Sequence, residues 1–457
     1  MLSRRDFLAS AGTLGAACSR SSTARPNILF LMPDQWRGMD LGAMGNPDVQ
    51  TPNMDALASG GALLSNVTAN CPVCCPARGT LLTGRFGHQH RVDVNDAPLP
   101  DAELTIAEIA QDHGYRTAFA GKWHLEGGKR LPGFVKPARR QGFQRWAANI
   151  CSHSYWNMHY FRDSPDPIPI DGYSAKAFTD ETISFIRRDP NTPFLAYLQW
   201  GPPHNPYVAP PEYMALYEPE RLRMRENWRG PVEFRPNRTI GSRADIAGYY
   251  AAITFLDHEV GRIVSALRET GQFRNTIIVI TSDHGDMLGS QGTYLKRKPW
   301  AESLHVPGIV HWPDGVVPAQ VLSVPFSHVD FVPTMLGLAG MAVPSVVAGT
   351  DLSRHISDST RSQPSGLPES VYAQSYTPTE RGEHPPWRAV RSRRYTYARH
   401  QHGPWLLYDN DSDPYQMRNL ADDPQHAAVM ARLDDLTMDW FRRTGDDWRE
   451  RRDLPYR

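Results

Sequence analysis

The sequence has few cysteines, no surplus of charge of either sign and no long hydrophobic run. Its 457 residues contain only five cysteines, of which Cys71, Cys74 and Cys75 are crowded together. So few cysteines exclude a disulfide scaffold for a chain of this size. Cys71 and Cys74 have the spacing of a redox pair or of half a zinc site. No second Cys or His pair with zinc-finger spacing follows them, which disfavours zinc.

The charges of the chain balance. Lys and Arg total 49, as do Asp and Glu, so the formal net charge is zero. This balance argues against a general affinity for nucleic acid, although a local site for an anionic ligand stays open. Beyond the N-terminus, no stretch approaches the roughly 20 apolar residues that cross a bilayer. We therefore expect a mature protein that is soluble, or that meets a membrane only through a lipid anchor.

Residues 1–24 have the pattern of an export signal. The charged stretch Ser3–Leu8, which contains Arg4-Arg5, is followed by a small and apolar run to Ala17. This pattern resembles a twin-arginine signal, whereas the Gly-rich run would make a poor core helix. Cys18 stands where a lipoprotein box would place it, but the apolar residue of that box comes one position early, so lipidation stays open. We expect the protein in the periplasm or at the cell surface.

Four apolar runs predict buried strands that end near ionisable residues. The runs cover residues 27–32, 117–120, 193–200 and 276–282, and helical patterns cover 105–113, 244–269 and 330–339. Strands that alternate with helices predict an α/β fold, with a mostly parallel central sheet sandwiched by helices. In such sheets ligands lie beyond the carboxyl ends of the strands. We therefore expect a site formed by Asp34, Lys122, His204, Asp283 and His284.

The last quarter of the chain predicts a separate small unit. Residues 357–368 are rich in Ser and Pro and predict a linker. Short antiparallel strands are expected at 371–373, 387–390, 395–398 and 405–408, and a helix from about Gln425 to Thr444. We predict a catalytic domain at 25–365 and a C-terminal α+β subdomain, an antiparallel sheet plus a helix, at 366–457.

Asp34 and the pair Asp283-His284 predict a metal site, because each follows an apolar strand. Carboxylate oxygens suit a hard divalent cation such as Ca²⁺ or Mg²⁺. The alternative is that Asp34 caps a helix and that Asp283-His284-Gly285 forms a turn.

Cys74 is expected at the N-terminus of a helix, because Pro76 and Arg78 follow it and an apolar turn ends in Gly84. Free backbone N–H groups there favour negative charge. From the residues alone, Cys74 is either a thiolate nucleophile or a buried structural cysteine.

Six ordered blocks resemble the type I sulfatases, a family of the alkaline-phosphatase-like superfamily. Cys74-Cys75-Pro76-Ala77-Arg78 matches the family's C-x-P-x-R signature, and Leu82–Arg85 matches its usual extension. The other blocks are Pro26–Phe30, Gly114–Leu125 with its G-K-W-H-L motif, Pro203–Pro206, Thr281–Gly289 followed by Lys296, and Leu407–Leu420.

The resemblance implies a modified nucleophile. A maturation enzyme would oxidise Cys74 to formylglycine, whose hydrated aldehyde carries two hydroxyls. One hydroxyl would attack sulfur beside the cation, His204 or Lys296 would protonate the leaving alcohol, and His124 would deprotonate the second hydroxyl. Arg78 would hold the hydroxyl, and Lys122 and Lys296 would pair with the sulfate oxygens, with Lys298 as an alternative to Lys296. The cation, Ca²⁺ with Mg²⁺ or Mn²⁺ as alternatives, would be held by Asp34, Gln35, residue 74, Asp283 and His284.

Two positions depart from the family pattern. Gln35 stands where the family often has Asp, and Ala77 stands where Ser is usual. Both departures resemble the branch that includes phosphonate monoester hydrolases and choline sulfatases, as well as some polysaccharide sulfatases. The resemblance therefore implies an exported sulfatase acting on a sulfated polysaccharide or its oligosaccharides. The alternatives are a phosphonate monoester or phosphodiester hydrolase on the same scaffold, or a catalytically silent glycan-binding protein.

Overall fold

The computed structural model describes residues 25–128, 130–358, 367–379 and 384–448. The predicted export signal at 1–24 and most of the predicted linker at 357–368 lie outside these residues. Among the helices described, none is both long and apolar enough to span a bilayer.

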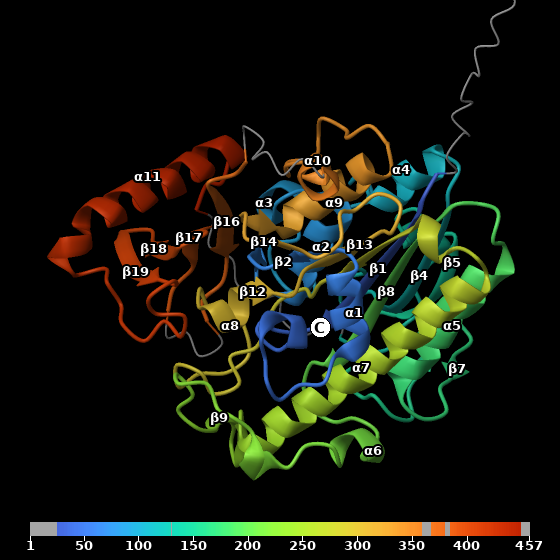
Figure 1. The fold of residues 1–457 in the computed structure, drawn as a ribbon, viewed down its shortest axis with the longest axis horizontal. Coiled ribbons are helices and arrows are strands. Elements are labelled where there is room, and N and C mark those ends of the chain that lie inside the picture. Colours follow the sequence, from blue (N-terminus) through green and yellow to red (C-terminus); the bar gives the residue numbers. More distant parts are fainter. Residues whose placement is uncertain (1–24, 129, 359–366, 380–383, 449–457) are drawn as a thin grey trace, which may run out of the picture.

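An eight-stranded sheet forms the centre of the catalytic part (Figure 1). Its strands are, in spatial order, β14 (Gln320–Leu322), β2 (Ala62–Leu64), β13 (Ile309–His311), β11 (Thr276–Ile280), β1 (Asn27–Asp34), β8 (Phe194–Pro203), β4 (Arg116–Lys122) and β5 (Arg145–Asn149). The strands from β11 to β5 pair in parallel, whereas β13 is antiparallel to both of its neighbours. The prediction of a mostly parallel sheet is confirmed.

Helices cover both faces of this sheet. On one face lie α1 (Pro52–Ser59), α5 (Ser174–Arg188) and α7 (Arg243–Glu269), and on the other lie α2 (Cys74–Thr83), α4 (Ile106–Asp112) and α9 (His328–Leu338). Along β1, Leu29 and Leu31 pack into the core of the first face, whereas Ile28 and Phe30 pack into that of the second. Side chains alternate between the faces of a strand, so a strand buried on both faces is apolar throughout.

A second sheet of four antiparallel strands follows residue 367 (Figure 1, orange to red). Its strands are β16 (Ser370–Ser375), β17 (Trp387–Ser392), β18 (Tyr395–His400) and β19 (Gly403–Asp409), and α11 (Ala427–Thr444) packs on them. The predicted C-terminal antiparallel sheet with its helix is thus confirmed, while the exact domain boundary stays a prediction.

Short elements complete the described part of the chain. Two of them, β9 (Val232–Arg235) and β10 (Arg238–Ile240), form an antiparallel hairpin. The others are β3 (Val67–Thr68), β12 (His305–Val306), β15 (Phe326–Ser327), β6 (His159–Tyr160), β7 (Ile168–Pro169), α3 (Gly87–His90), α6 (Pro211–Met214), α8 (Ala301–Leu304), α10 (Ser353–Ser357), and 3₁₀ turns at 42–44, 137–139, 219–221, 273–275 and 424–426.

The carboxyl ends of β1, β11, β8 and β4 meet at one edge of the central sheet. β11 ends at Ile280 rather than at the predicted Ser282. The Ser282 hydroxyl accepts a hydrogen bond from Trp36 N at 2.8 Å and donates to Pro33 O at 2.8 Å. These bonds draw the chain out of the ladder, so Asp283 and His284 lie on a loop.

Candidate active site

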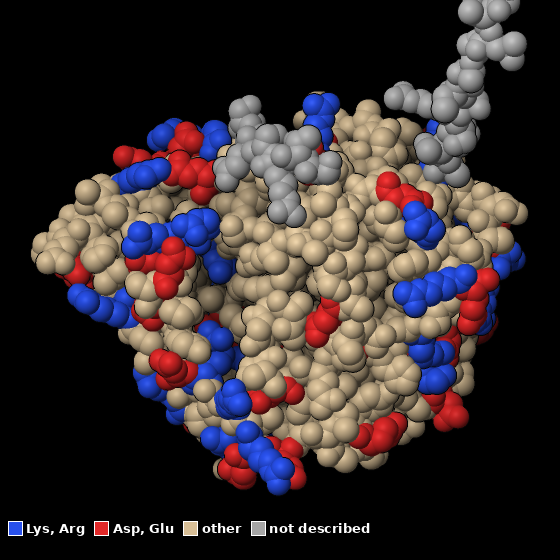
Figure 2. Space-filling model, viewed as in Figure 1, with Lys and Arg blue, Asp and Glu red and all other residues tan. Residues whose placement is uncertain are grey.

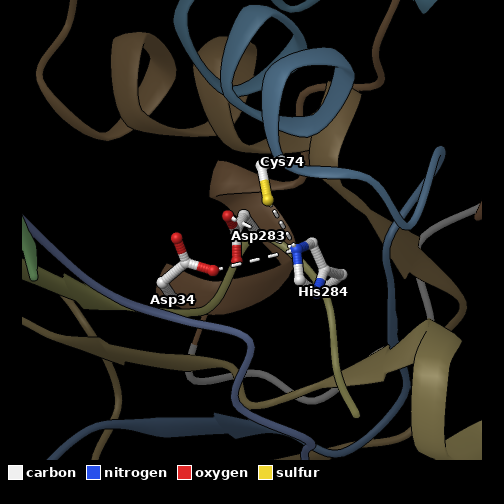
Figure 3. A group of neighbouring side chains, drawn as sticks. All are labelled: Asp34, Cys74, Asp283 and His284. Carbon is white, nitrogen blue, oxygen red and sulfur yellow. Dashed lines mark hydrogen bonds and ion pairs between the residues drawn. The ribbon is translucent and has the colours of Figure 1, made fainter. Parts of the chain in front are cut away.

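The predicted metal-binding residues come together in one buried cluster (Figure 3). Asp34 ends β1, Asp283 and His284 follow β11, and Cys74 begins α2. One ligand atom from each lies within 4.8 Å of the others, and all four side chains are buried. This confirms the meeting of strand ends that the sequence predicts.

The arrangement of donor atoms fits a divalent cation. Asp34 Oδ1 is buried and accepts no hydrogen bond from any described residue. A buried carboxylate oxygen without a partner is costly, and a cation would satisfy it. His284 Nδ1 donates to Gly285 O at 2.9 Å, so Nε2 points into the cluster, at 3.8 Å from Asp34 Oδ1 and 3.7 Å from Asp283 Oδ2. Such a hydrogen bond fixes the tautomer of a metal-binding imidazole.

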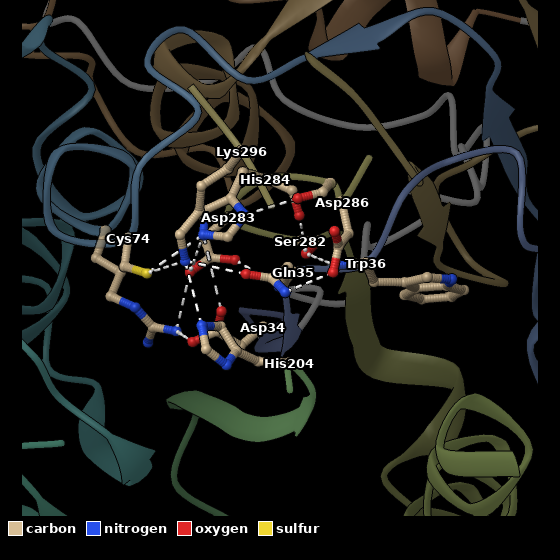
Figure 4. A network of polar contacts seen from close by, with 12 residues as sticks. Asp34, Gln35, Trp36, Cys74, His204, Ser282, Asp283, His284, Asp286 and Lys296 are labelled. Atoms are coloured by element: carbon tan, nitrogen blue, oxygen red, sulfur yellow. Dashed lines mark hydrogen bonds and ion pairs between the residues drawn. The ribbon is translucent and has the colours of Figure 1, made fainter. Parts of the chain in front are cut away.

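Gln35 lies beside this cluster in a network of polar contacts (Figure 4). Its Nε2 donates to Asp286 Oδ2 at 2.6 Å, and its Oε1 accepts from Lys296 Nζ at 3.0 Å. Its backbone N–H donates to Asp283 Oδ1 at 2.9 Å. Asp286, which also accepts from the Tyr207 hydroxyl at 2.6 Å, therefore orients the Gln35 amide. Sequence reasoning missed this role of Asp286, although it lies in the same block as Asp283.

Cys74 is surrounded by positive charge. Its Sγ lies 3.0 Å from Lys296 Nζ and 3.3 Å from His284 Nε2. Burial alone would raise the pKa of the Cys74 thiol, but Lys296, Lys122 and His284 hold it well below its usual range. The position therefore stabilises an anionic side chain. For the chemistry that the resemblance implies, the sulfur stands in for the hydroxyl oxygens of formylglycine.

His204 and Lys296 form a pair on the cleft side of Cys74. His204 Nδ1 donates to Asn205 O at 2.8 Å, so its Nε2 accepts from Lys296 Nζ at 3.2 Å. His153 stacks on His204, with ring centroids 4.5 Å apart. Lys298, the alternative to Lys296, instead donates to Tyr294 O at 2.7 Å.

Arg78 in α2 and Lys122 at the end of β4 form ion pairs with the carboxylates of this cluster. Arg78 Nη2 lies 2.9 Å from Asp34 Oδ2 and 3.1 Å from Asp283 Oδ2. Lys122 Nζ lies 2.6 Å from Asp34 Oδ2. Burial would raise the pKa of Asp34, but Lys122, Arg78 and His204 together outweigh burial and hold it far below its usual range. Both cations lie beside the predicted metal ligands, and contact of Lys122 with sulfate stays a prediction.

His124 is held by a carboxylate that sequence reasoning missed. Its Nε2 lies 3.3 Å from Asp96 Oδ1, and Arg130 Nε donates to both oxygens of Asp96 at 2.8 Å. Cys75 Sγ donates to His124 O at 2.9 Å and accepts from Asp96 N at 3.3 Å. No spacing or motif signals this contact, because Asp96 and His124 meet only through the packing of two loops.

A cleft of about 880 Å³ opens above this cluster. Cys74, His124, His204 and Lys296 line it, so all four can reach a ligand, whereas the carboxylates lie beneath. A groove of about 970 Å³ between α5 and α7 is larger but contains none of the predicted site residues. We place the site in the smaller cleft, because the anionic nucleophile position and its cations converge there.

The fold and the cleft together define a hydrolase of anionic esters, built at the carboxyl edge of a parallel sheet. The family model named Sulfatase matches residues 26–341, and the model named N-sulphoglucosamine sulphohydrolase, C-terminal, matches residues 289–441. The chain belongs to the sulfatase family and is a sulfuric ester hydrolase.

Known relatives cover nearly the whole chain. An ulvan-active sulfatase of Formosa agariphila is 36% identical over 437 residues, which is 93% of this chain and 83% of that protein. An endo-4-O-sulfatase of Bacteroides thetaiotaomicron is 27% identical, over 88% of this chain and 89% of that protein.

Solved structures share the fold. A structure from work on glycosaminoglycan metabolism by Bacteroides thetaiotaomicron has a TM-score of 0.83 at 25% identity and covers 93% of this chain and 97% of its own. The phosphonate monoester hydrolase of Agrobacterium radiobacter has a TM-score of 0.77 at 23% identity, with coverage of 92% and 96%, and shares the fold alone.

Proposed function

We propose that the protein is an exported sulfatase that cleaves sulfate esters of a sulfated polysaccharide or its oligosaccharides, through a formylglycine made from Cys74 and a divalent cation. The observation that carries the proposal is the position of Cys74. It begins α2 in a C-x-P-x-R motif, and its sulfur lies with Asp34, Asp283 and His284 in one buried cluster. The names of the ulvan-active sulfatase and the endo-4-O-sulfatase support a glycan substrate.

The cation would be held by Asp34, Asp283, His284 and residue 74, with the Gln35 amide oxygen as a further ligand. Ca²⁺ suits the carboxylate oxygens, and Mg²⁺ or Mn²⁺ are alternatives. When bound, the cation polarises the ester oxygens and lowers the pKa of a hydroxyl beside it. Gln35 contributes no negative charge, so it weakens the hold on the cation relative to an Asp.

The hydrated aldehyde of formylglycine would supply two hydroxyls at position 74, one of which would attack sulfur as the S–O bond to the alcohol breaks. Arg78, fixed by Asp34 and Asp283, orients this side chain. Lys122 and Lys296 neutralise the sulfate oxygens in a site from which water is largely excluded.

Two imidazoles move protons on opposite sides of residue 74. On one side, Lys296 Nζ donates to His204 Nε2, so this pair holds the proton that the leaving alcohol requires. On the other side, His124, held by Asp96, accepts the proton of the remaining hydroxyl. Sulfate then leaves as the aldehyde reforms.

The same proposal includes export and maturation. The N-terminal pattern at residues 1–24 supports export through the twin-arginine route to the periplasm or the cell surface, with lipidation at Cys18 open. That route carries folded proteins, so a maturation enzyme can modify Cys74 before export. A mass measurement on the peptide that contains residue 74 tests this step: retention of the thiol after coexpression with such an enzyme would contradict it.

A phosphonate monoester hydrolase is the second candidate, favoured by Gln35 and Ala77. Hydrolysis of an aryl sulfate and of a phenylphosphonate monoester should be compared with the formylglycine-containing enzyme and with Cys74→Ala as the inactive control. We expect the sulfate to be the better substrate. A phosphonate preference of several orders of magnitude would overturn the sulfatase proposal, and binding of glycans without turnover would favour a non-catalytic role.

A further inference from the structure

The charged residues that line the cleft above Cys74 are all basic. Its basic lining residues are Arg130, Arg235, Arg238, Lys296 and Arg297, and no carboxylate of a described residue lines it. The chain as a whole has equal numbers of acidic and basic residues, and on the face drawn in Figure 2 the two kinds are intermingled. The lining therefore departs locally from the rest of the molecule.

Three of these five side chains already have a role in the structure. Lys296 contacts Cys74, and Arg130 is paired with Asp96. Arg297 is buried and donates to Thr377 Oγ1 at 3.1 Å, which ties the cleft to the segment after β16.

Arg235 and Arg238 are different, because both are exposed and neither forms an ion pair with a described residue. They stand opposite each other across the β9–β10 hairpin, where they are direct partners in the strand register. Like charges directly opposite each other in an antiparallel pair are destabilising. An anion bound at the cleft would neutralise the charges of Arg235 and Arg238 and so stabilise the hairpin that carries them.

The aromatic side chain beneath the two arginines holds them at the cleft. The guanidinium carbons of Arg235 and Arg238 lie 5.0 Å and 5.9 Å from the centre of the Phe234 ring. Phe234 lines the same cleft and packs edge-on against Tyr294, with centroids 5.5 Å apart. Contact with a ring restricts the conformations of an arginine side chain, so less conformational entropy is lost when it binds an anion.

A single sulfate ester does not need these two charges, since Lys296 lines the cleft beside Cys74 and Lys122 lies beneath it on Asp34. The cleft volume of about 880 Å³ is also near the upper end of the roughly 300–1,000 Å³ that is usual for small-ligand sites. There is room for a sugar unit beyond the one that carries the ester.

We infer that Arg235 and Arg238 form a second anion subsite, which binds an acidic group on the sugar next to the one that loses sulfate. The substrate is then a glycan with at least two anionic groups, the second being a carboxylate or a further sulfate. Arginine binds either group through two parallel hydrogen bonds. This inference rests on the proposed function and adds the substrate class to it.

Three disaccharides test the inference. All carry the same sulfated sugar, and the neighbouring sugar is neutral, carries a carboxylate or carries a second sulfate. For the wild-type enzyme we expect kcat/KM to be about five- to tenfold higher with an acidic neighbour than with the neutral one, the range of two solvent-exposed ion pairs. Added salt should reduce this ratio. The larger of the two acidic ratios identifies the preferred group.

The double variant Arg235→Gln/Arg238→Gln should bring the ratio close to one, mainly through KM. Arg235→Lys/Arg238→Lys keeps the charge and should retain part of the preference. Arg188→Gln/Arg354→Gln removes the same charge from exposed positions outside the cleft and should leave the ratio as in the wild type. The melting temperature of the Gln double variant should not fall, because it loses a like-charge pair.

Two results would overturn the inference alone: equal kcat/KM for all three disaccharides in the wild type, or a preference that survives Arg235→Gln/Arg238→Gln. Failure of the formylglycine-containing wild type to cleave any sulfate ester, aryl sulfates included, would instead overturn the proposed function and the inference with it. The two failures are therefore distinguishable.

Discussion

At the scale of single residues, the contact between His124 and Asp96 gives the imidazole a fixed orientation. The carboxylate lies 3.3 Å from His124 Nε2 and is itself held by Arg130. In Asp96→Asn the shape is kept, but the negative charge beside the imidazole is lost and Arg130 loses its ion pair with Asp96. We expect kcat on an aryl sulfate to fall roughly 10- to 100-fold, the usual effect of removing an orienting partner, with little change in KM.

The control for this prediction is Asp101→Asn. Asp101 is an exposed carboxylate that pairs with Arg139, so its loss should leave kcat unchanged. Full activity in Asp96→Asn would show that His124 acts without this partner.

The two neighbouring lysines Lys296 and Lys298 should respond differently to the same substitution. Lys296 Nζ contacts Cys74 and His204, whereas Lys298 Nζ donates to the backbone of Tyr294. We expect Lys296→Met to lower kcat by roughly 10²- to 10³-fold, because a charge that stabilises the transition state is lost. Lys298→Met should retain kcat and lose stability instead. Steady-state kinetics and thermal unfolding of both variants check this, and a large loss of kcat in Lys298→Met alone would reverse the assignment.

The sequence predicts some residues of the site and not others. Asp34, Cys74, Asp283 and His284 were predictable, because each stands at the end of an apolar strand or at the start of a helix within a motif. Asp96 was not predictable, because its contact with His124 depends on the path of a loop. The hairpin arginines were missed for the same reason, since no period or motif places residues 235 and 238 at the cleft.

At the scale of elements, an ion pair fixes the end of α11 to the second sheet. Arg388 on β17 binds Asp446 through two nitrogens, with Nη2 at 2.8 Å from Oδ1, and both side chains are fully buried. The Tyr372 hydroxyl donates to Asp446 Oδ2 at 2.9 Å. In Asp446→Asn the charge of Arg388 is left without its partner, so we expect a loss of about 3–5 kcal/mol in the free energy of unfolding.

The loss of stability in Asp446→Asn should depend on pH. Burial would raise the pKa of Asp446, but the hydrogen bonds and the charge of Arg388, together with His88 and the Tyr372 hydroxyl, outweigh burial and lower it. A carboxyl whose pKa is lower in the folded state stabilises the fold above its unfolded pKa of about 4, and this stabilisation is lost as the pH falls through the folded value.

Thermal unfolding of the wild type and of Asp446→Asn should therefore differ most near pH 7 and converge in acid. Asp439→Asn removes an exposed carboxylate of α11 that pairs with Arg443, and should cost less than about 1 kcal/mol. A difference between wild type and Asp446→Asn that grows in acid would contradict the assigned sign.

The elements themselves were predictable to different degrees. The long apolar runs predicted the bounds of β1, β4, β8 and β11 to within a few residues. A strand buried on both faces is apolar throughout, so polar residues mark where it ends. The antiparallel strand β13 and its partner β2 were missed, because each has only three residues and no periodicity can be read from them. β8 extends to Pro203, three residues beyond its predicted end.

At the scale of the whole molecule, the acidic cluster is balanced by the protein's own cations. Asp34 and Asp283 share Arg78, and Lys122 also contacts Asp34. These cations offset part of the repulsion between the two carboxylates before any metal binds, although burial and Asp34 still raise the pKa of Asp283. We therefore expect the protein without its cation to remain folded, although the cation is needed for activity.

Removal of the cation with a chelator tests this separation of stability from activity. A ligand that binds only the folded state stabilises it by about 3 kcal/mol at 100 times its Kd, which for a large domain is a change of a few degrees in melting temperature. We expect chelation to abolish hydrolysis of an aryl sulfate while unfolding stays cooperative and Tm falls by only that amount. Re-addition of Ca²⁺, Mg²⁺ and Mn²⁺ in turn identifies the ion. Asp34→Asn should show a smaller shift of Tm with added cation, because its amide oxygen carries no negative charge. Unfolding of the wild type on chelation would mean that Arg78 and Lys122 do not hold the cluster together.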